Sequence, residues 1–178
     1  ADGTVVRGQG HPNVYLVDKG ILKLFSEFTF KQRNAEKDLQ VIPDGEIALY
    51  TEQGYVVPLE GTLVQSPSSN DVYLINESRR LTLTSELFSN RGFSIKDVVR
   101  LTTDTELVAI PMGPPAPPRE GTYFAITGSP ELYLYKNGAK HLISAFVAKQ
   151  RSITPDYYFE AGIISNWADG IVVAPRDG

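Results

Sequence analysis

The sequence of 178 residues has no cysteine, two histidines, one methionine and one tryptophan. Without cysteine the chain has no disulfide, no thiolate metal site and no cysteine nucleophile. Lysine and arginine form no run, and the formal net charge is −4. We therefore expect no electrostatic attraction to nucleic acid or to an anionic membrane. No apolar stretch approaches the length of a membrane span, so we also expect no membrane insertion.

The motifs of common catalytic sites are missing as well. The chain has no HExxH, GxSxG, SxxK or P-loop motif, and no GxGxxG motif follows a strand pattern. Its two histidines stand in different contexts, His11 in a Gly-His-Pro loop and His141 in a strand pattern. Acidic residues are dispersed, and no Asp-x-Asp-x-Asp calcium loop occurs. We predict that the chain is not an enzyme and uses no cofactor and no metal.

An internal repeat with three copies is the strongest feature that is present. Each copy opens on Gly-Thr, carries a tyrosine at the same offset, and ends on proline, any residue, an acidic residue and glycine. The matched segments are Gly3-Thr4, Gly61-Thr62 and Gly121-Thr122, then Tyr15, Tyr73 and Tyr133, then residues 58–61, 118–121 and 175–178. Matches at fixed offsets in three places predict three copies of one structural unit.

The repeat boundaries predict units at residues 1–61, 62–121 and 122–178. Units of this size rarely bury a sufficient core alone, so we expect them to form one structural domain. The proline-rich stretch 111–118 joins the second and third units. Its composition predicts an extended, stiff strap within that domain.

The pattern inside each repeat indicates a hairpin followed by short helices. The clearest hairpin turn is Asn137-Gly138, since both residues tolerate positive φ. The strands are apolar at both alternating positions, which predicts cover on both faces. We expect first helices capped by Ser26, Ser85 and Ser144, and second helices near 35–39, 95–100 and 154–159. The predicted fold class is α+β, with three tandem hairpin-plus-short-helices repeats in one compact body.

Aromatic residues are the main candidates for ligand contact. The recurring Tyr15, Tyr73 and Tyr133 favour a core role with the hydroxyl at the rim, although three sugar-stacking platforms are the alternative. Residues that differ among the copies are better candidates. These predicted ligand-binding residues are Trp167, Tyr135, His141, Tyr157 and Tyr158. Trp167 lies near Asn and Asp in a loop-like context, which suits a carbohydrate contact or a loop residue that packs back on the body.

The second repeat carries a resemblance to a known kind of module. Its motifs are Gly61-Thr62-Leu63-Val64, residues 71–75 (DVYLI), residues 85–88 (SELF) and residues 91–99 (RGFSIKDVV). This pattern resembles a tandem repeat of exported bacterial proteins, often found beside peptidoglycan-cleaving or other hydrolase domains. The first repeat lacks the Gly-Phe element, and the third has residues 157–159 (YYF) in place of Asp-Val. The resemblance implies export, a secreted or cell-surface location and a non-catalytic role.

Three functional hypotheses follow. The first is a non-enzymatic bacterial surface module that binds envelope or matrix glycan, with a cell-wall or extracellular polysaccharide as partner. The second is a structural subunit of an extracellular filament or surface array, whose partners are other copies of itself. The second hypothesis rests on residues 175–178 (PRDG) continuing in phase into residues 1–4 (ADGT). The third is an accessory domain of a secreted hydrolase.

Overall fold

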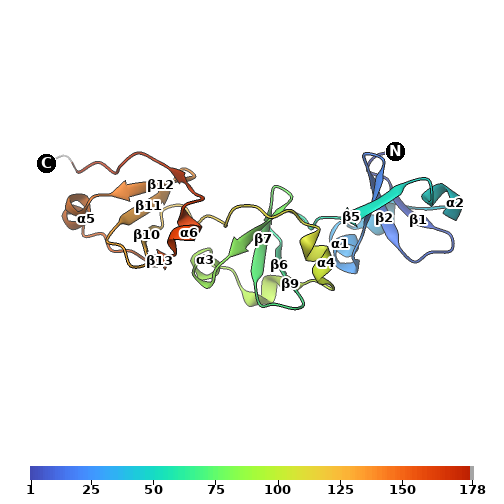
Figure 1. Cartoon of the computed structure of the whole chain (residues 1–178), viewed down its shortest axis with the longest axis horizontal. Coiled ribbons are helices and arrows are strands. Elements are labelled where there is room, and N and C mark those ends of the chain that lie inside the picture. The colour runs from blue at the N-terminus through green and yellow to red at the C-terminus, as the bar shows by residue number, and fades with distance from the viewer. Residues whose placement is uncertain (177–178) are drawn as a thin grey trace. The chain divides into compact units, whose positions relative to one another are not determined.

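The computed structural model describes residues 1–176, and Asp177 and Gly178, which we matched to the ends of the other repeats, lie outside the described residues. The described chain forms fourteen strands in three mixed sheets, six short α-helices and two 3₁₀ helices (Figure 1). The predicted α+β class is confirmed.

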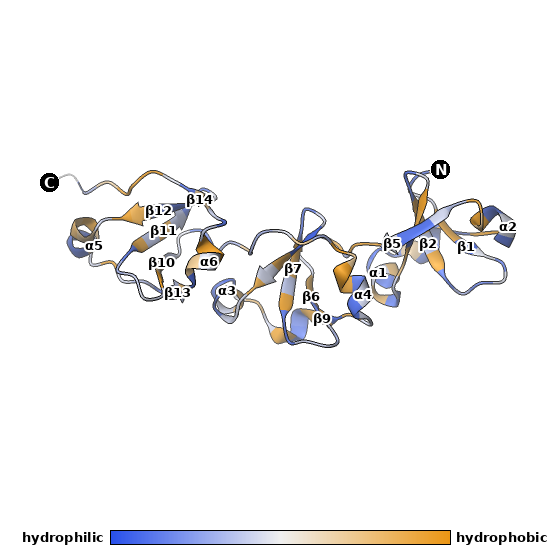
Figure 2. Cartoon of the chain, viewed as in Figure 1, coloured by the Kyte–Doolittle hydropathy of each residue, from blue (hydrophilic) through white to orange (hydrophobic). Residues whose placement is uncertain are grey.

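The first sheet has the strand order β4-β1-β2-β3-β5. Its central strands are antiparallel, and β4 and β5 join the two sides in parallel. The edge strand β5 is almost fully exposed and hydrophilic (Figure 2). The elements here are β1 (Val5–Gly8), β2 (Val14–Asp18), β3 (Ile21–Leu24), α1 (Glu27–Gln32), η1 (Ala35–Asp38), β4 (Leu39–Ile42), α2 (Asp44–Ile47) and β5 (Thr51–Tyr55).

The second sheet has the order β8-β7-β6-β9. An isolated parallel bridge between Arg80 and Met112 takes the place that β5 has in the first sheet. The elements are β6 (Leu63–Gln65), β7 (Val72–Asn76), β8 (Arg79–Leu83), α3 (Ser85–Asn90), η2 (Ile95–Asp97), β9 (Val98–Arg100) and α4 (Asp104–Val108).

The third sheet has the order β13-β10-β11-β12-β14, which again places parallel strands at both edges. Its elements are β10 (Tyr123–Ile126), β11 (Leu132–Lys136), β12 (Ala139–Ile143), α5 (Ala145–Arg151), β13 (Tyr157–Phe159), α6 (Ala161–Ile164) and β14 (Ala168–Asp169).

The three sheets share one register around their first strand. The antiparallel pairs are Val6 with Tyr15, Val64 with Tyr73, and Phe124 with Tyr133. On its other edge the same first-strand residue pairs in parallel, with Gln40, Val99 and Tyr157 respectively. The three predicted repeat segments therefore pair their strands in corresponding ways.

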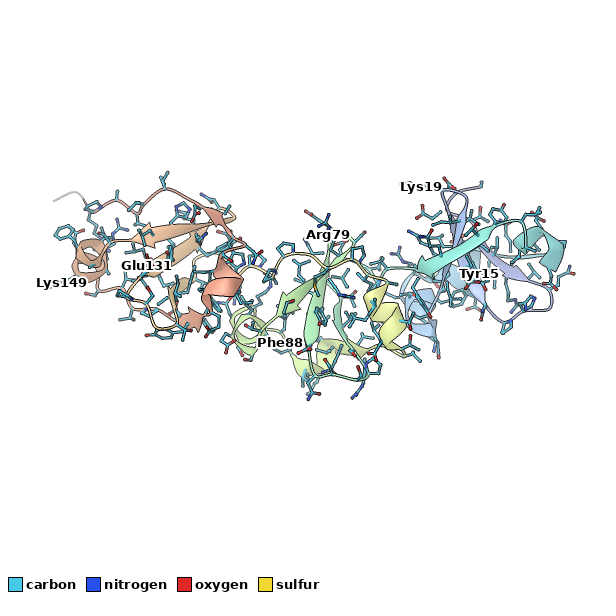
Figure 3. The ribbon with its side chains drawn as sticks, in the orientation of Figure 1. Tyr15, Lys19, Arg79, Phe88, Glu131 and Lys149 are labelled. Carbon is cyan, nitrogen blue, oxygen red and sulfur yellow. The ribbon has the colours of Figure 1, made fainter. Side chains whose placement is uncertain are left out.

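Each hairpin turns through two residues with positive φ, as a type I′ turn requires. The pairs are Lys19-Gly20, Glu77-Ser78 and Asn137-Gly138, so the turn predicted at Asn137-Gly138 is confirmed. Lys19 and Arg79 lie at the first two of these hairpin ends (Figure 3). Glu77-Ser78 is the least favourable pair, because neither residue is a glycine or an asparagine.

The first helix of each repeat is capped by a hydroxyl. Ser26, Thr84 and Ser144 accept a hydrogen bond from the backbone N–H three residues on. The predicted caps Ser26 and Ser144 are confirmed. The prediction of Ser85 was wrong by one residue, because Thr84 carries an equivalent hydroxyl and has the extended backbone that an N-cap needs.

The second helices were predicted less well. Residues 35–38 form a 3₁₀ helix, but only residues 95–97 of 95–100 do so, and Val98–Arg100 is a strand. The helix predicted at 154–159 is wrong, since Tyr157–Phe159 is strand β13. Aromatic and β-branched residues favour extended backbone when a neighbouring strand offers hydrogen bonds, and β13 pairs in parallel with β10.

The contacts divide the chain into two compact units. The first comprises Ala1–Arg80 with Val98–Gly113, and the second comprises Leu81–Asp97 with the chain from Pro114 onward. Both predicted repeat boundaries, 61 and 121, fall inside a compact unit. The expectation of one structural domain stays a prediction.

Each compact unit buries its own apolar residues. The first contains three clusters, centred on Val5 and Phe25, on Val6 and Leu22, and on Val64 and Ile75. In the second unit, α5 packs Val147 on one face of the third sheet. Burial of this apolar surface is the main stabilising term of each unit.

In each unit a cationic side chain, buried in one and half-buried in the other, bonds to a carbonyl near a helix end. Lys140 is 8% exposed, and its Nζ donates to the carbonyl of Trp167 at 2.6 Å and pairs with Asp169 at 2.8 Å. Arg80 stands at the matching position of the second sheet and donates to the carbonyl of Leu107. These cations satisfy carbonyl oxygens at or just beyond the ends of short helices, where the helix itself supplies no partner.

An aspartate at the start of α4 anchors a loop of the first unit. The Asp104 carboxylate accepts hydrogen bonds from the hydroxyls of Ser66 and Ser68. These bonds, that of Ser66 first, lower the pKa of Asp104 below its ordinary value because they favour the charged form. Asp44 plays the matching role in the first repeat, where it accepts from the backbone N–H of Gly10.

Candidate functional site

Trp167 and Tyr135, both predicted ligand contacts, lie in an aromatic cluster inside the second unit. They are 5% and 6% exposed. The indole meets Phe124, Phe159 and Tyr135 edge-on, with ring centroids 5.4, 5.5 and 5.9 Å away, and its Nε1 donates to the carbonyl of Pro115 at 3.4 Å. Trp167 therefore packs back on the body. Tyr135 is buried on the side of the indole, although part of it lines a surface pocket with Arg91, Phe93 and Glu120.

The two tyrosines of β11 differ in burial, in the opposite order to our expectation. We expected Tyr133 in the core and Tyr135 on display, but Tyr135 is buried and Tyr133 is half-buried. Trp167 covers Tyr135, and burial raises the pKa of the Tyr135 phenol. Tyr133 stacks on Phe124 at 5.4 Å and donates to Glu131 at 3.2 Å.

The tyrosine of the first repeat lies in the core with its hydroxyl at the rim, as we expected. Tyr15 is buried, and its hydroxyl donates to Glu52 at 3.1 Å at the rim. Burial raises the pKa of the Tyr15 phenol. Tyr73 is half-buried against the cluster of Val64 and Ile75.

His141 is held by backbone groups. Its Nδ1 lies 2.8 Å from the carbonyl oxygen of Ile171, and its Nε2 lies 3.0 Å from that of Lys136. The backbone of Gly170 lies close to the ring and leaves no room for a side chain, because a Cβ at Gly170 would lie 2.3 Å from an imidazole carbon. Both ring nitrogens thus meet the protein, and the ring fastens the segment after β14 to the hairpin of β11 and β12.

Tyr157 and Tyr158 are the predicted contacts that lie at a surface hollow, which we call the tyrosine hollow. It belongs to the second unit and has a volume of about 410 Å³. Tyr158 is 58% exposed, and Tyr157 lies parallel to Phe159 with centroids 6.1 Å apart. The lining residues are Thr84, Glu86, Thr127, Asp156, Tyr157, Tyr158, Phe159, Glu160 and Ile163.

The charged residues that line this hollow are all acidic. Hydrogen bonds, first from its own backbone N–H, lower the pKa of Glu86 and keep it ionised at neutral pH. One oxygen of Asp156 accepts from the backbone N–H of Tyr123 at 3.3 Å. Glu160 is the N-cap residue of α6, but its side chain makes no capping bond.

A second feature, which we call a linker joint, connects the first repeat to the second within the first unit. Gln32, the last residue of α1, accepts from the N–H of Leu59 at 2.9 Å and donates to the hydroxyl of Thr62 at 2.8 Å. The next residue, Arg33, donates to the carbonyl of Val57 at 2.7 Å. The end of a helix thereby grips the segment that leads into the following repeat.

The same joint recurs in the second unit. Asn90, the last residue of α3, accepts from the N–H of Arg119 at 2.7 Å and donates to the hydroxyl of Thr122 at 2.9 Å. Arg91 donates to the carbonyl of Pro117 at 2.8 Å. Burial lowers the pKa of the Arg91 guanidinium, which remains charged at any physiological pH.

Each joint continues into the next hairpin through a glutamate. Glu60 accepts from both N–H groups of the turn Glu77-Ser78, at 2.6 and 2.9 Å. Glu120 accepts from both N–H groups of Asn137-Gly138, at 2.7 and 3.0 Å. A linker residue therefore holds the turn of the repeat that it enters, including the unfavourable turn at Glu77-Ser78.

A third amide–arginine pair lies at the end of α5. Gln150 accepts from the N–H of Arg176 at 2.9 Å, and Arg151 donates to the carbonyl of Ala174 at 2.6 Å. Sequence reasoning missed these pairs. Their signal was present, because Gln32-Arg33, Asn90-Arg91 and Gln150-Arg151 stand at corresponding places in the three repeats.

The described residues hold neither a metal-ligand group nor a helix of membrane-spanning type. Across residues 1–176, no three histidine, aspartate or glutamate side chains are grouped so that they could hold a metal ion. In the same part of the chain, no helix has the length and apolar character needed to cross a membrane.

Comparisons with known proteins give no family. No protein-family model matches the chain, and no curated protein matches it. The solved structures that align with it include the periplasmic assembly from the ESX-5 inner membrane complex and an intact ESX-5 inner membrane complex. Each is 12% identical with a TM-score of 0.29, and they cover 97% and 98% of this chain. The alignments span 61% and 52% of those chains, and a score this low supports neither a shared fold nor a shared function.

Proposed function

We propose that this chain is a non-catalytic modular scaffold of a bacterial surface or envelope, built from three copies of one hairpin-and-helix unit. The recurring linker joint is the observation that carries the proposal. An amide–arginine pair ends the first helix of every repeat, and in two of them its partners and distances correspond. The surface location rests on the resemblance of the second repeat to exported bacterial modules.

The joint suits a scaffold because it removes freedom where a chain of domains would otherwise bend. Neutral hydrogen bonds each add about 0.5–1.5 kcal/mol, and those made by charged groups about 1.5–3 kcal/mol. The glutamate adds two charge-assisted bonds to the next turn. A linker with this many fixed partners is held against the helix end that precedes it and the turn that follows it.

Proteolysis tests the joint directly, since each one contains a glutamate followed by glycine. Glutamyl endopeptidase should cut the folded chain slowly after Glu120, whose carboxylate is bound to the turn. Removing the grip with Asn90→Ala and Arg91→Ala should accelerate that cleavage by about tenfold or more, because about 1.4 kcal/mol corresponds to tenfold. Ser89→Ala, an exposed neighbour, is the control. Equal cleavage in all three proteins would contradict a rigid joint.

Assembly with other copies of the chain is tested by mass in solution. Size-exclusion chromatography with light scattering, followed by electron microscopy, should show concentration-dependent oligomers if the scaffold is an assembly subunit. A monodisperse monomer at all concentrations would rule out self-assembly. The scaffold proposal would then apply only within one chain. Incubation with labelled peptidoglycan should release no soluble fragment, and release would overturn the non-catalytic proposal.

Glycan binding is the second candidate, and the tyrosine hollow favours it. An exposed tyrosine offers a flat apolar face with a polar rim, and carboxylates and hydroxyls beside it can accept or donate to sugar hydroxyls. A pull-down on cell-wall sacculi or a glycan array compared with Tyr158→Ala tests it. Binding that survives Tyr158→Ala unchanged would place the glycan elsewhere.

A further inference from the structure

The tyrosine hollow combines acidic side chains with the rings of Tyr157 and Tyr158, which we call the aromatic shelf. Tyr157 and Tyr158 come from β13, Glu86 from the first turn of α3, and Glu160 from the residue before α6. These segments belong to the same compact unit, and α3 and β13 are in contact. The hollow is therefore a surface built by the fold and not by one flexible loop.

The charge of this surface selects among ligands. Glu86, Asp156 and Glu160 line the hollow, whereas lysine and arginine are absent from its lining within residues 1–176. The Glu160 side chain makes no capping bond to α6 and is exposed to solvent. Carboxylates near an aromatic face attract a cation by charge and through the negative face of the ring. An anionic ligand would be repelled.

We propose that the tyrosine hollow binds the free amino group of a cationic amino sugar, with the sugar ring lying against Tyr158 and the ammonium near Glu160. This proposal rests on the glycan-binding candidate and names its ligand class. A volume of about 410 Å³ exceeds that of an ammonium group and lies in the range of small-ligand sites. Thr84 and Thr127 add neutral hydroxyls suited to the hydroxyl groups of a sugar.

A sugar fits these residues better than a basic peptide. A lysine side chain presents its charge on a long flexible stem, and ordering that stem costs entropy. An amino sugar carries its ammonium on a rigid ring, so the aromatic contact and the charge contact are made together. The shelf and the carboxylates then act on one ligand.

Calorimetry with three probes of similar length tests the proposal. The probes are a glucosamine tetramer with free amines, an N-acetylglucosamine tetramer and a tetralysine peptide, all at slightly acidic pH and low salt. The free-amine tetramer should bind at least about tenfold more tightly than the N-acetylated one, and its affinity should fall as salt rises. Glu160→Gln and Tyr158→Ala should each weaken it at least about fivefold. Glu36→Gln, which makes the same charge change at an exposed residue of the first unit, should not.

Each contrary outcome has a distinct meaning. Equal binding of the two sugar tetramers would overturn the amine preference and leave the glycan candidate standing. Tetralysine binding as tightly as the amino sugar would overturn the sugar assignment in favour of an acidic surface. Absence of binding by any sugar would overturn both the amino-sugar proposal and the glycan-binding candidate. The scaffold proposal is judged separately, by cleavage after Glu120. Far-UV circular dichroism of each variant separates lost contacts from lost folding.

Discussion

Truncating Asn90 to alanine should destabilise the second compact unit. Asn90 is 7% exposed, and it makes two side-chain hydrogen bonds across the linker, to the N–H of Arg119 at 2.7 Å and to the hydroxyl of Thr122 at 2.9 Å. The substitution removes both bonds and leaves the backbone around them in place.

The magnitude follows from these two bonds. Each is worth about 0.5–1.5 kcal/mol, and a buried group left without a partner costs about 1–3 kcal/mol. The Thr122 hydroxyl still donates to the carbonyl of Arg119 at 2.7 Å, so it is not orphaned. We expect Asn90→Ala to lower the free energy of unfolding by about 2 kcal/mol, which moves a urea midpoint by about 1 M at ordinary slopes.

Trp167 makes the measurement specific. It is the single tryptophan of the chain, it is buried, and it belongs to the same compact unit as Asn90. Its fluorescence therefore reports the unfolding of that unit. The matched control is Gln32→Ala, which deletes the corresponding amide in the first unit. Gln32→Ala should shift the transition seen by circular dichroism and leave the Trp167 transition largely in place.

Two results would refute this reasoning. A shift of less than about 0.5 kcal/mol for Asn90→Ala, which is typical of an ordinary surface change, would mean that the joint adds nothing to stability. An equal shift of the Trp167 transition by Gln32→Ala would mean that the two units unfold together and that the joint is not a local device.

Three further predictions concern other contacts. Gly170→Ala should destabilise the chain by about 1–3 kcal/mol, because its Cβ would lie 2.3 Å from the His141 ring, and His141→Ala in the same chain should restore part of the loss in thermal unfolding. Lys140→Met, which keeps the apolar stem and removes the bond to the carbonyl of Trp167, should cost about 1–3 kcal/mol in urea unfolding; no loss would make that bond dispensable. The hydrogen-bonded carboxylate of Asp104 has a folded pKa below its unfolded value of about 3.9. Its contribution to the free energy of unfolding is therefore complete above the unfolded pKa and is lost as pH falls through the lower folded pKa. Urea midpoints of the wild type and Asp104→Asn should therefore differ at neutral pH and converge in acid, and a constant difference would contradict the assignment.

Local patterns predicted much of the secondary structure. The Asn137-Gly138 turn and the caps Ser26 and Ser144 were visible because each depends on the chemistry of one or two residues. The wrong helix prediction at residues 154–159 arose because a contact far away in the sequence decides the structure there. Thr154 and Pro155 resemble a helix start, but the parallel edge of β10 was free to pair with Tyr157–Phe159, and a distant strand leaves no local signature.

The candidate sites divide in the same way. Tyr157 and Tyr158 were predicted as ligand contacts, and the structure places them at a hollow that their sequence neighbours share with the distant Thr84, Glu86 and Thr127. Trp167 was equally plausible from its neighbours. Only the packing of Phe124, Tyr135 and Phe159 around it decides that it is an interior residue.

Turn chemistry, helix caps and the spacing of the three repeats could be read from the chain, because they depend on neighbours within a few residues or on recurrence along it. Tertiary structure alone decided which aromatic residues are buried, which carboxylates share a hollow, and that an amide–arginine pair at a helix end grips a linker 23 or more residues away. Those outcomes depend on which surfaces exclude water together, and that property belongs to the folded chain.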